Sequence, residues 1–408
     1  MIDYYETKTH PITKRMVLDA YKHVRDNGGS AGIDGISISD YAEQLPANLY
    51  KLWNRMTSGS YLPALVKEVR IPKKSGGTRG LGVPTVEDRI AQQVVKSYLE
   101  PKIDGGFHPS SFGYRQGKSA HHALAQTHKW CKHLSWVIDL DIKGFFDNID
   151  HGLMMKAVER YTQEKWVLMY VERWLKAGVM KDTGIEDRDK GTPQGGVISP
   201  LLANIFLHFA FDKWMEKNFP PIKFERYCDD IIVHCASIKQ AEFLKQRIAQ
   251  RLNDCKLELN EAKTQIVYCP SGRHQERHSK RSFNFLGYTF RPRWINNKQG
   301  GELAFTPCMS GTAKKSVMES VRGMQFKRKQ IPIQRMAVLL NPKIRGWIAY
   351  YCKWNKWTTT ELWWWMNNRL IRWVMKTRRF SKKRACRWLQ GICKTQPGLF
   401  AHWQLLKP

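Results

Sequence analysis

The chain has 408 residues, 42% of them hydrophobic, and its apolar runs are far shorter than the roughly 20 residues that cross a bilayer. Sixty-seven Lys and Arg residues against thirty-six Asp and Glu residues give a net charge of +31, which favours a polyanionic partner such as nucleic acid. No targeting segment is visible at the N-terminus, and the nine cysteines lack metal-ligand spacing. We therefore expect a cytoplasmic protein with reduced thiols and no membrane contact.

The first hundred residues have the pattern of helices separated by turn-rich segments. Apolar residues recur at helical spacing, and Gly-rich segments interrupt them. Two strand-like runs flank a Ser-Gly-Gly turn that has basic residues around it. The predicted elements are a loop over 27–35, helices over 41–56 and 87–99, and a hairpin over 67–84.

The middle of the chain alternates between predicted strands and helices. Strands are expected over 134–142 and 265–268, and as two short segments on either side of Cys228-Asp229-Asp230. Pro200 suits the first turn of a helix over 199–207. Further predictions are one long helix over 150–177, a helix over 238–252 and a basic loop over 270–280.

The composition changes beyond Arg291, where Trp and basic residues follow helical spacing. From Gly301 to the end there are 22 Lys and Arg residues against 3 acidic ones, a net charge of +19, and nine of the sixteen Trp residues. We therefore place a boundary near residue 300. Three consecutive Trp residues, at 363–365, cover most of the circumference of a helix, so at least one should belong to the core.

The stretch Phe224–His234, FERYCDDIIVH, places two carboxylates between apolar residues. Such a pair costs several kcal/mol unless it is compensated, and a divalent cation is the natural compensation. A further ligand could come from Asp139 or Asp141, which point to the same face of a strand. A simple polar turn at Asp229 and Asp230 is the alternative.

Tyr227–Asp230 resembles the Y-x-D-D box of reverse transcriptases, and further motifs resemble those of group II intron-type enzymes over nearly the whole chain. In chain order they are GSAGIDG (29–35), IPKK with RGLGVP (71–74 and 79–84), SFGYRQGKSA (111–120), DIKGFFD (141–147), GTPQGGVISP (191–200), NEAKT (260–264), FLG (285–287) and GWIAYY (346–351).

The resemblance implies an α+β fold of the right-hand polymerase type. Fingers and palm, made of an antiparallel sheet plus helices, would occupy residues 1–300, with fingers mainly over 1–130 and palm mainly over 131–300. An α-helical, nucleic-acid-binding thumb would occupy 301–408. The implied activity is RNA-directed DNA polymerisation, a nucleotidyl transfer that uses dNTPs and yields cDNA.

The resemblance also implies the roles of the carboxylates. Asp141, Asp229 and Asp230 match the catalytic metal ligands, assisted by the carbonyl of Ile142. They would hold two Mg²⁺ ions, with Mn²⁺ as the alternative. Asp139 would then be a structural polar residue.

Substrate contacts follow from motif position. Lys73 and Arg79 would meet the triphosphate, and Gln194 would lie against the nucleotide and template. Phe146 would exclude a 2′ hydroxyl, with Phe145 as its competitor. Lys263 would protonate the pyrophosphate or simply be a solvated lysine at a strand end.

Nucleic-acid contacts are expected from basic residues in two places. Arg115 and Lys118 would hold template phosphates. The thumb residues expected to hold a duplex or structured RNA are Lys327, Arg328, Lys329, Arg378, Arg379, Lys382, Lys383 and Arg384.

The sequence ends at Pro408 without the DNA-binding and endonuclease segments usual in intron maturases, so target-site integration is not expected. It resembles the small bacterial antiphage enzymes that copy a partner structured non-coding RNA. The alternatives are a trimmed intron maturase and an RNA chaperone with a vestigial palm. The intact carboxylates argue against the chaperone.

Overall fold

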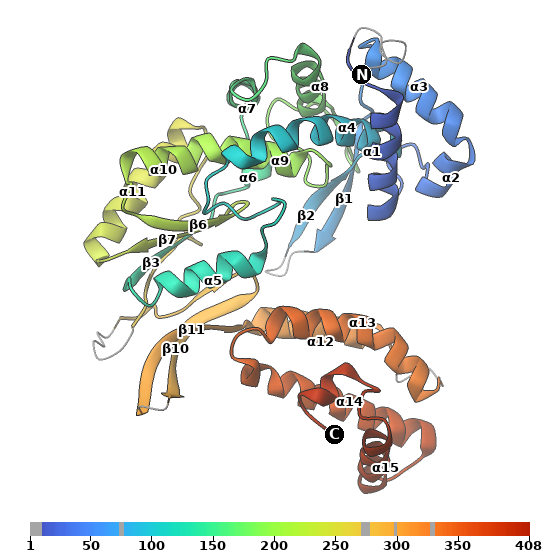
Figure 1. Ribbon diagram of the computed structural model, residues 1–408, viewed down its shortest axis with the longest axis vertical. Helices are drawn as coiled ribbons and strands as arrows, with labels where there is room; N and C mark the ends of the chain where they lie inside the picture. Colours follow the sequence, from blue (N-terminus) through green and yellow to red (C-terminus); the bar gives the residue numbers. More distant parts are fainter. Residues whose placement is uncertain (1–9, 73–76, 271–277, 298–299, 327–330) are drawn as a thin grey trace. The chain divides into compact units, whose positions relative to one another are not determined.

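The computed structural model describes residues 10–72, 77–270, 278–297, 300–326 and 331–408. The chain forms two compact units, one built from Met1–Ala123 with Ile138–Ile266 and the other from Leu124–Val137 with Val267–Pro408 (Figure 1). The boundary expected near residue 300 falls within the second unit. None of the described helices is both long and apolar enough to cross a membrane.

The first unit contains most of the helices and two groups of strands. Its helices are α1 (Lys14–Asn27), α2 (Ile38–Glu43), α3 (Leu45–Thr57), α4 (Val86–Ile103), α6 (Phe145–Asn148), α7 (His151–Glu159), α8 (Lys165–Lys176), α9 (Ser199–Leu207), α10 (Lys213–Asn218) and α11 (Ile238–Asp254), with the short η2 (Asp104–Gly106) and η3 (His208–Asp212). Its strands are β1 (Val66–Pro72), β2 (Thr78–Val83), β4 (Val179–Lys181), β5 (Gly184–Glu186), β6 (Lys223–Tyr227) and β7 (Asp230–Cys235). The elements α5 (Ala120–Trp130), β3 (Trp136–Leu140) and β8 (Gln265–Tyr268) include residues of both units.

Two four-stranded sheets carry the site. One has the order β2-β1-β4-β5, with β1 antiparallel to β2 and parallel to β4. The other has the order β6-β7-β3-β8, with β6 antiparallel to β7. The predicted hairpin over 67–84 and the strand pair around Cys228-Asp229-Asp230 are thus confirmed.

Side-chain caps define where several helices begin. Thr13, Thr85 and Ser237 each accept a hydrogen bond from a backbone N–H in the first turn of α1, α4 and α11. The single long helix expected over 150–177 is wrong, because the chain forms α7 and α8 there. Thr162 lies between them and accepts the N–H of Glu164 at 3.2 Å, which satisfies the backbone outside a helix.

The helix that begins at Ser199 does not keep one geometry. Pro200 occupies its first turn, as predicted. After α9 the chain widens into the π-helical segment η3, and then continues as α10. A π-helical turn is rare and commonly marks a functional position.

The second unit combines a three-stranded sheet with a group of helices. Its elements are β9 (Phe283–Phe285), β10 (Tyr288–Asn297), β11 (Gly300–Met309), α12 (Gly311–Gly323), α13 (Ile333–Tyr351), η5 (Lys356–Thr359), α14 (Thr360–Arg378), α15 (Lys382–Thr395) and η6 (Ala401–Gln404). The strand order is β11-β10-β9. The helical pattern predicted directly after Arg291 is therefore wrong, because residues 292–297 of β10 pair in antiparallel fashion with residues 300–305 of β11.

An apolar core joins the four helices α12, α13, α14 and α15, which Figure 1 shows gathered within this unit. Trp363 is buried in that core, whereas its neighbour Trp364 is 62% exposed. The prediction that at least one of the three consecutive Trp residues belongs to the core is confirmed. Most of the loop expected over 270–280 lies outside the described residues.

Candidate active site

The turn between β6 and β7 presents the two adjacent carboxylates. Tyr227 pairs with Asp230, so Cys228 and Asp229 form the two-residue loop of a hairpin. Cys228 has a φ of 60°, which is uncommon for a residue with a side chain. The turn packs against Gly113, where an added Cβ would lie 2.5 Å from the backbone nitrogen of Cys228. Gly113 is therefore required for the close approach.

A buried ion pair holds this turn from beneath. Arg226 is fully buried and donates to both carboxylate oxygens of Asp212, at 2.7 and 2.5 Å. Its Nη1 donates to Asn204 Oδ1 at 3.0 Å and to the carbonyl of Cys228 at 3.2 Å. Asn204 in turn donates to the carbonyl of Gly113 at 2.7 Å. One guanidinium thus connects the π-helical segment, α9 and the catalytic turn.

The charge state of Asp212 follows from its neighbour. Burial opposes ionisation of this carboxyl group, but the guanidinium of Arg226 outweighs burial and lowers the pKa of Asp212. The pair is therefore ionised, and its charges are compensated within the protein. Neither residue was predicted from the sequence, because they lie 14 positions apart and no local pattern links them.

Asp141 follows β3 and is positioned by the NEAKT segment. Its backbone N–H donates to Thr264 Oγ1 at 3.2 Å, and its carboxylate accepts Nδ2 of Asn260 at 2.7 Å. Lys263 Nζ lies 3.5 Å from Asp141 Oδ2. Ile142 bridges to Leu259 in antiparallel fashion, through bonds that do not use the Ile142 carbonyl. Asn260 was not predicted as a site residue, although its place at the start of the NEAKT motif was a usable signal.

Four carboxylates lie close enough to influence one another. Part of Asp230 is exposed, yet the protein around its carboxyl group limits hydration; this desolvation and the charge of Asp229 raise its pKa to about 7. Asp139 and Asp141 add to the rise, and Lys263 opposes it. Burial likewise raises the pKa of Asp139 to about 6, while a hydrogen bond from Gln265 at 3.0 Å opposes the rise. The structure therefore brings the three predicted catalytic aspartates into electrostatic contact.

This donor set has the chemistry that divalent cations require. Hard cations such as Mg²⁺ and Mn²⁺ prefer carboxylate and carbonyl oxygens, and a bound cation would relieve the repulsion that raises the pKa of Asp230. Within the described residues, no three His, Cys, Asp or Glu side chains are near enough to one point to enclose an ion. The carboxylates therefore fit such ions in donor type and in charge, but their side chains do not converge on one point in the described part of the protein.

The residues expected at the nucleotide lie on adjoining elements. Phe145 is buried at the start of α6, whereas Phe146 is half-buried, so Phe145 is the core member of the pair. The carbonyl of Gln194 accepts the N–H of Gly82 at 2.8 Å, which ties the 191–195 turn to β2. Arg79 is exposed on the same strand, and Lys73 lies outside the described residues.

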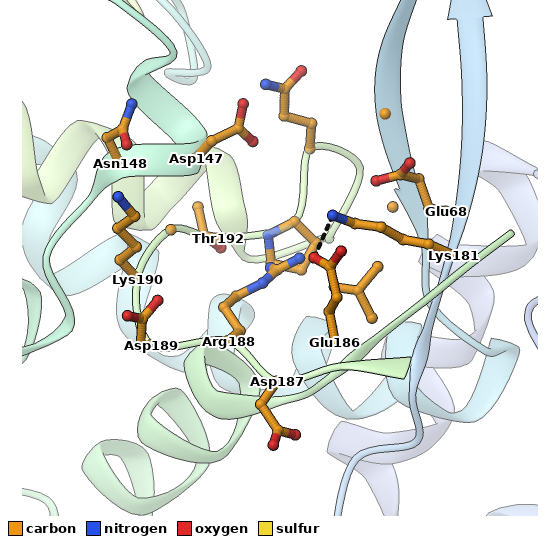
Figure 2. Close-up of a pocket in the computed structure, with 16 residues that line it drawn as sticks. Glu68, Asp147, Asn148, Lys181, Glu186, Asp187, Arg188, Asp189, Lys190 and Thr192 are labelled. Carbon is orange, nitrogen blue, oxygen red and sulfur yellow. Dashed lines mark hydrogen bonds and ion pairs between the residues drawn. The ribbon is translucent and has the colours of Figure 1, made fainter. Parts of the chain in front are cut away.

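A cavity of about 440 Å³ opens beside this turn (Figure 2). Figure 2 shows Arg188 among carboxylates from several elements, and the ion pair between Lys181 and Glu186. The charged side chains that line it are Glu68, Asp147, Glu186, Asp187 and Asp189, with Lys181, Arg188 and Lys190. Because acidic groups exceed basic ones, the cavity lacks the positive field that a triphosphate needs. The nucleotide phosphates are not expected inside it.

Arg115 and Lys118, which were expected at template phosphates, differ in how free their side chains are to bind a phosphate. Arg115 has a side chain only 7% exposed, and it donates to Asp104 and to the carbonyls of His108 and Ser111. This geometry gives Arg115 a structural role in the loop instead of the predicted phosphate contact, because its donors are already used. Lys118 is half-buried, with its Nζ 5.3 Å from the ring centroid of Phe112.

The basic thumb residues that the structure describes lie at the junction of α14 and α15. Arg378, Arg379, Lys382, Lys383 and Arg384 are all exposed, whereas Lys327, Arg328 and Lys329 lie outside the described residues. The guanidinium of Arg378 lies 4.4 Å from the ring centroid of Trp388, and that of Arg384 lies 4.2 Å from the ring centroid of Phe380. These contacts hold the two charges at the surface.

Residues 71–290 match the reverse transcriptase (RNA-dependent DNA polymerase) family, and residues 314–390 match the group II intron maturase-specific domain. The chain belongs to the reverse transcriptase family. It is of the group II intron type, with a right-hand polymerase fold, and the activity of its family is RNA-directed DNA polymerisation.

Known proteins similar to this reverse transcriptase include two bacterial relatives. It is 30% identical to protein YkfC of Escherichia coli K12 over 296 residues, which cover 63% of this chain and 74% of YkfC. It is 27% identical to the group II intron-encoded protein LtrA of Lactococcus lactis subsp. cremoris, over 67% of this chain and 54% of LtrA. The chain thus spans about half the length of LtrA. A telomerase structure from Candida albicans aligns over 91% of this chain and 68% of its own, with 11% identity and a TM-score of 0.49.

Proposed function

We propose that this reverse transcriptase copies a structured non-coding RNA into cDNA, at a site formed by Asp141, Asp229 and Asp230. The observation that carries the proposal is the position of these carboxylates at the end of β3 and the β6–β7 turn, where the charges of Asp229 and Asp141 help to raise the pKa of Asp230. Carboxylates that repel one another destabilise a fold unless they are compensated, so their clustering indicates a ligand of opposite charge.

The reaction would join the primer to the nucleotide. The oxygen of the primer 3′ hydroxyl forms a bond to the α-phosphorus of a dNTP, the bond from that phosphorus to the bridging oxygen of pyrophosphate breaks, and the hydroxyl proton is lost to solvent. Two Mg²⁺ ions, when bound, would activate the hydroxyl and stabilise the leaving oxygens. Asp141, Asp229 and Asp230 would hold them without covalent chemistry.

Other side chains would orient and neutralise the substrate. Arg79, exposed on β2, would meet the triphosphate, and Phe146 would lie beneath the sugar and exclude a 2′ hydroxyl. Gln194 would contact the nucleotide base. Lys263, which is exposed and lies 3.5 Å from Asp141, would supply a proton to the departing pyrophosphate.

Primer extension tests the catalytic assignment. The variant that combines Asp229→Ala with Asp230→Ala should lose cDNA synthesis with Mg²⁺ and dNTPs. A matched control combines Glu242→Ala with Asp254→Ala, which removes two exposed carboxylates from α11 and should retain activity. Extension that survives the first double change would show that the aspartates do not carry the reaction.

The proposal also includes the kind of template and the cellular role of the enzyme. The excess of positive charge beyond residue 300, +19, favours a structured RNA as partner, and the motifs resemble those of compact antiphage enzymes. Sequencing the nucleic acid that copurifies with the protein would reveal template, product and primer junction. Plating phage on cells with the wild-type gene and with the double aspartate variant tests the defence role, which requires protection by the wild type alone.

A maturase that assists intron splicing is the second candidate, because residues 314–390 match the maturase-specific domain. This role would depend on RNA binding and not on polymerisation. Splicing of an intron from the same locus should then persist in the double aspartate variant. A gene with no intron sequence on either side of it would argue against this role.

A further inference from the structure

A groove of about 560 Å³ lies within the second unit, apart from the aspartates. Strand β10, the end of β11, the start of α12 and the η5–α14 junction form its walls. It is lined mainly by polar and cationic side chains. It shares no lining residue with the catalytic site proposed for this enzyme.

Cationic side chains converge on this groove. Arg291 and Arg293 lie two positions apart on β10, so they share one face and are roughly 6.6 Å apart along the strand. Lys314 reaches it from α12 and pairs with Glu361, the one carboxylate among the lining residues. Three cations therefore face one anion. The Nε of Arg293 is buried and has no hydrogen-bond partner among the described residues.

An exposed aromatic ring stands at the same groove. Trp357 is 78% exposed, the highest value for a large hydrophobic side chain in the described part of the protein. Exposing an indole to water is unfavourable, and Lys356 Nζ lies 5.2 Å from its ring centroid. A ring in this setting suits stacking with a planar ligand.

The position of Trp357 is fixed by the segment that carries it. Asn355, with a φ of 45°, donates through Nδ2 to Thr306 Oγ1 at 3.0 Å and to the carbonyl of Pro307 at 2.8 Å, which binds η5 to β11. At the other end of η5, Thr359 Oγ1 accepts the indole N–H of the buried Trp363 at 2.9 Å. The backbone that carries the ring is thus held in place before any ligand arrives, which lowers the entropic cost of binding.

We propose that this groove binds unpaired nucleotides, with backbone phosphates on Arg291, Arg293 and Lys314 and one base stacked on Trp357. Phosphates require the cations, and stacking requires a base that is not already stacked within a duplex. A paired helix offers phosphates but no free base face, so the ring favours a single strand. The ligand could be a loop of the partner RNA or the single-stranded cDNA, which share this chemistry.

The test measures binding of short fluorescent oligonucleotides by anisotropy. The 408-residue chain is kept in EDTA without dNTPs and is first saturated with an unlabelled template–primer duplex, so that the polymerase site is occupied. Trp357→Ala should weaken binding roughly 5- to 150-fold, the equivalent of about 1–3 kcal/mol for one stacked base. Trp357→Phe keeps a ring and should recover most of the affinity. Trp364→Ala removes another exposed Trp and is the matched control.

The salt dependence tests the phosphate contacts independently. Combining Arg291→Gln with Arg293→Gln should reduce the slope of log K against log salt by about 1.4, since each phosphate contact on a single strand contributes about 0.7. The control combines Lys343→Gln with Arg345→Gln, two exposed cations of α13, and should change the slope less.

The outcomes separate the possible ligands and sites. If the Trp357→Ala and double arginine variants lose affinity only for RNA oligonucleotides, the groove binds the partner RNA. If they lose affinity only for DNA oligonucleotides, it binds the cDNA. Equal binding by wild type, Trp357→Ala and the double arginine variant would overturn the proposal, as would an equal loss for a blunt duplex. The double aspartate variant should bind like wild type, so failure of the polymerase proposal would not be confused with failure of this one.

Discussion

Replacing Asp230 with Asn should stabilise the metal-free protein while it removes catalysis. Desolvation and the charge of Asp229 raise the pKa of Asp230 from 3.8 to about 7, so the folded state binds this proton more tightly than the unfolded state. Stability must then fall as the pH rises from about 4 to about 7, where the folded state holds a proton that the unfolded state has lost. Asn carries no charge and avoids that loss.

The expected gain in the free energy of unfolding follows from the pKa shift of Asp230. Three pKa units at 1.36 kcal/mol each set a ceiling of about 4 kcal/mol, and solvent exposure of Asp230 reduces the expected gain to about 1–2 kcal/mol above pH 7. At about 2–4 °C per kcal/mol, the midpoint of thermal unfolding should rise by roughly 2–8 °C.

Thermal unfolding in EDTA at pH 5, 6, 7 and 8 measures this gain for Asp230→Asn against wild type. The gain should grow from pH 5 to pH 7 and change little above it, and saturating Mg²⁺ should reverse the order by stabilising only the wild type. Glu242→Gln, which neutralises an exposed carboxylate on α11, should give no such pH dependence. A variant less stable than wild type at pH 8, or a gain independent of pH, would refute the reasoning.

Three further predictions concern the same region. Arg226→Met should destabilise the protein by about 3–5 kcal/mol because it leaves Asp212 buried and unpaired, and the double variant with Asp212→Leu should recover part of that loss in urea unfolding. Gly113→Ala should lower kcat in primer extension, since the new Cβ would lie 2.5 Å from the catalytic turn, whereas Gly105→Ala meets no atom within 4 Å and should have little effect. Phe146→Val should reduce the kcat/KM preference for dNTPs over rNTPs by about 10- to 100-fold, with unchanged discrimination contradicting the gate.

Much of the fold was predictable because its signals are local. The hairpin over 67–84, the strand before Asp141 and the helix at Pro200 each depend on turn residues or periodicity within a short window. The β10–β11 hairpin was missed because the basic and Trp-rich composition after Arg291 suggested a helical thumb. The alternation of Tyr288 and Phe290 was the available signal.

The site was only partly predictable because its supports are distant in sequence. Strand periodicity could not separate Asp139 from Asp141, since both point to one face. In the structure, Gln265 holds Asp139 whereas Asn260 and Lys263 meet Asp141. The structural role of Arg115 is invisible in sequence, because an arginine between Gly113 and Gly117 is equally compatible with a phosphate or a neighbouring loop as its partner.

The π-helical segment His208–Asp212 makes the length of one helix matter to nucleotide addition. Asp212 is its last residue, and the wider turn sets the direction in which this side chain leaves the helix. Deleting one residue upstream to restore a regular α-helix would rotate Asp212 by about 100°, away from Arg226. Insertions and deletions between Ser199 and Asp212 should therefore be far less tolerated than in the exposed loops of the same unit.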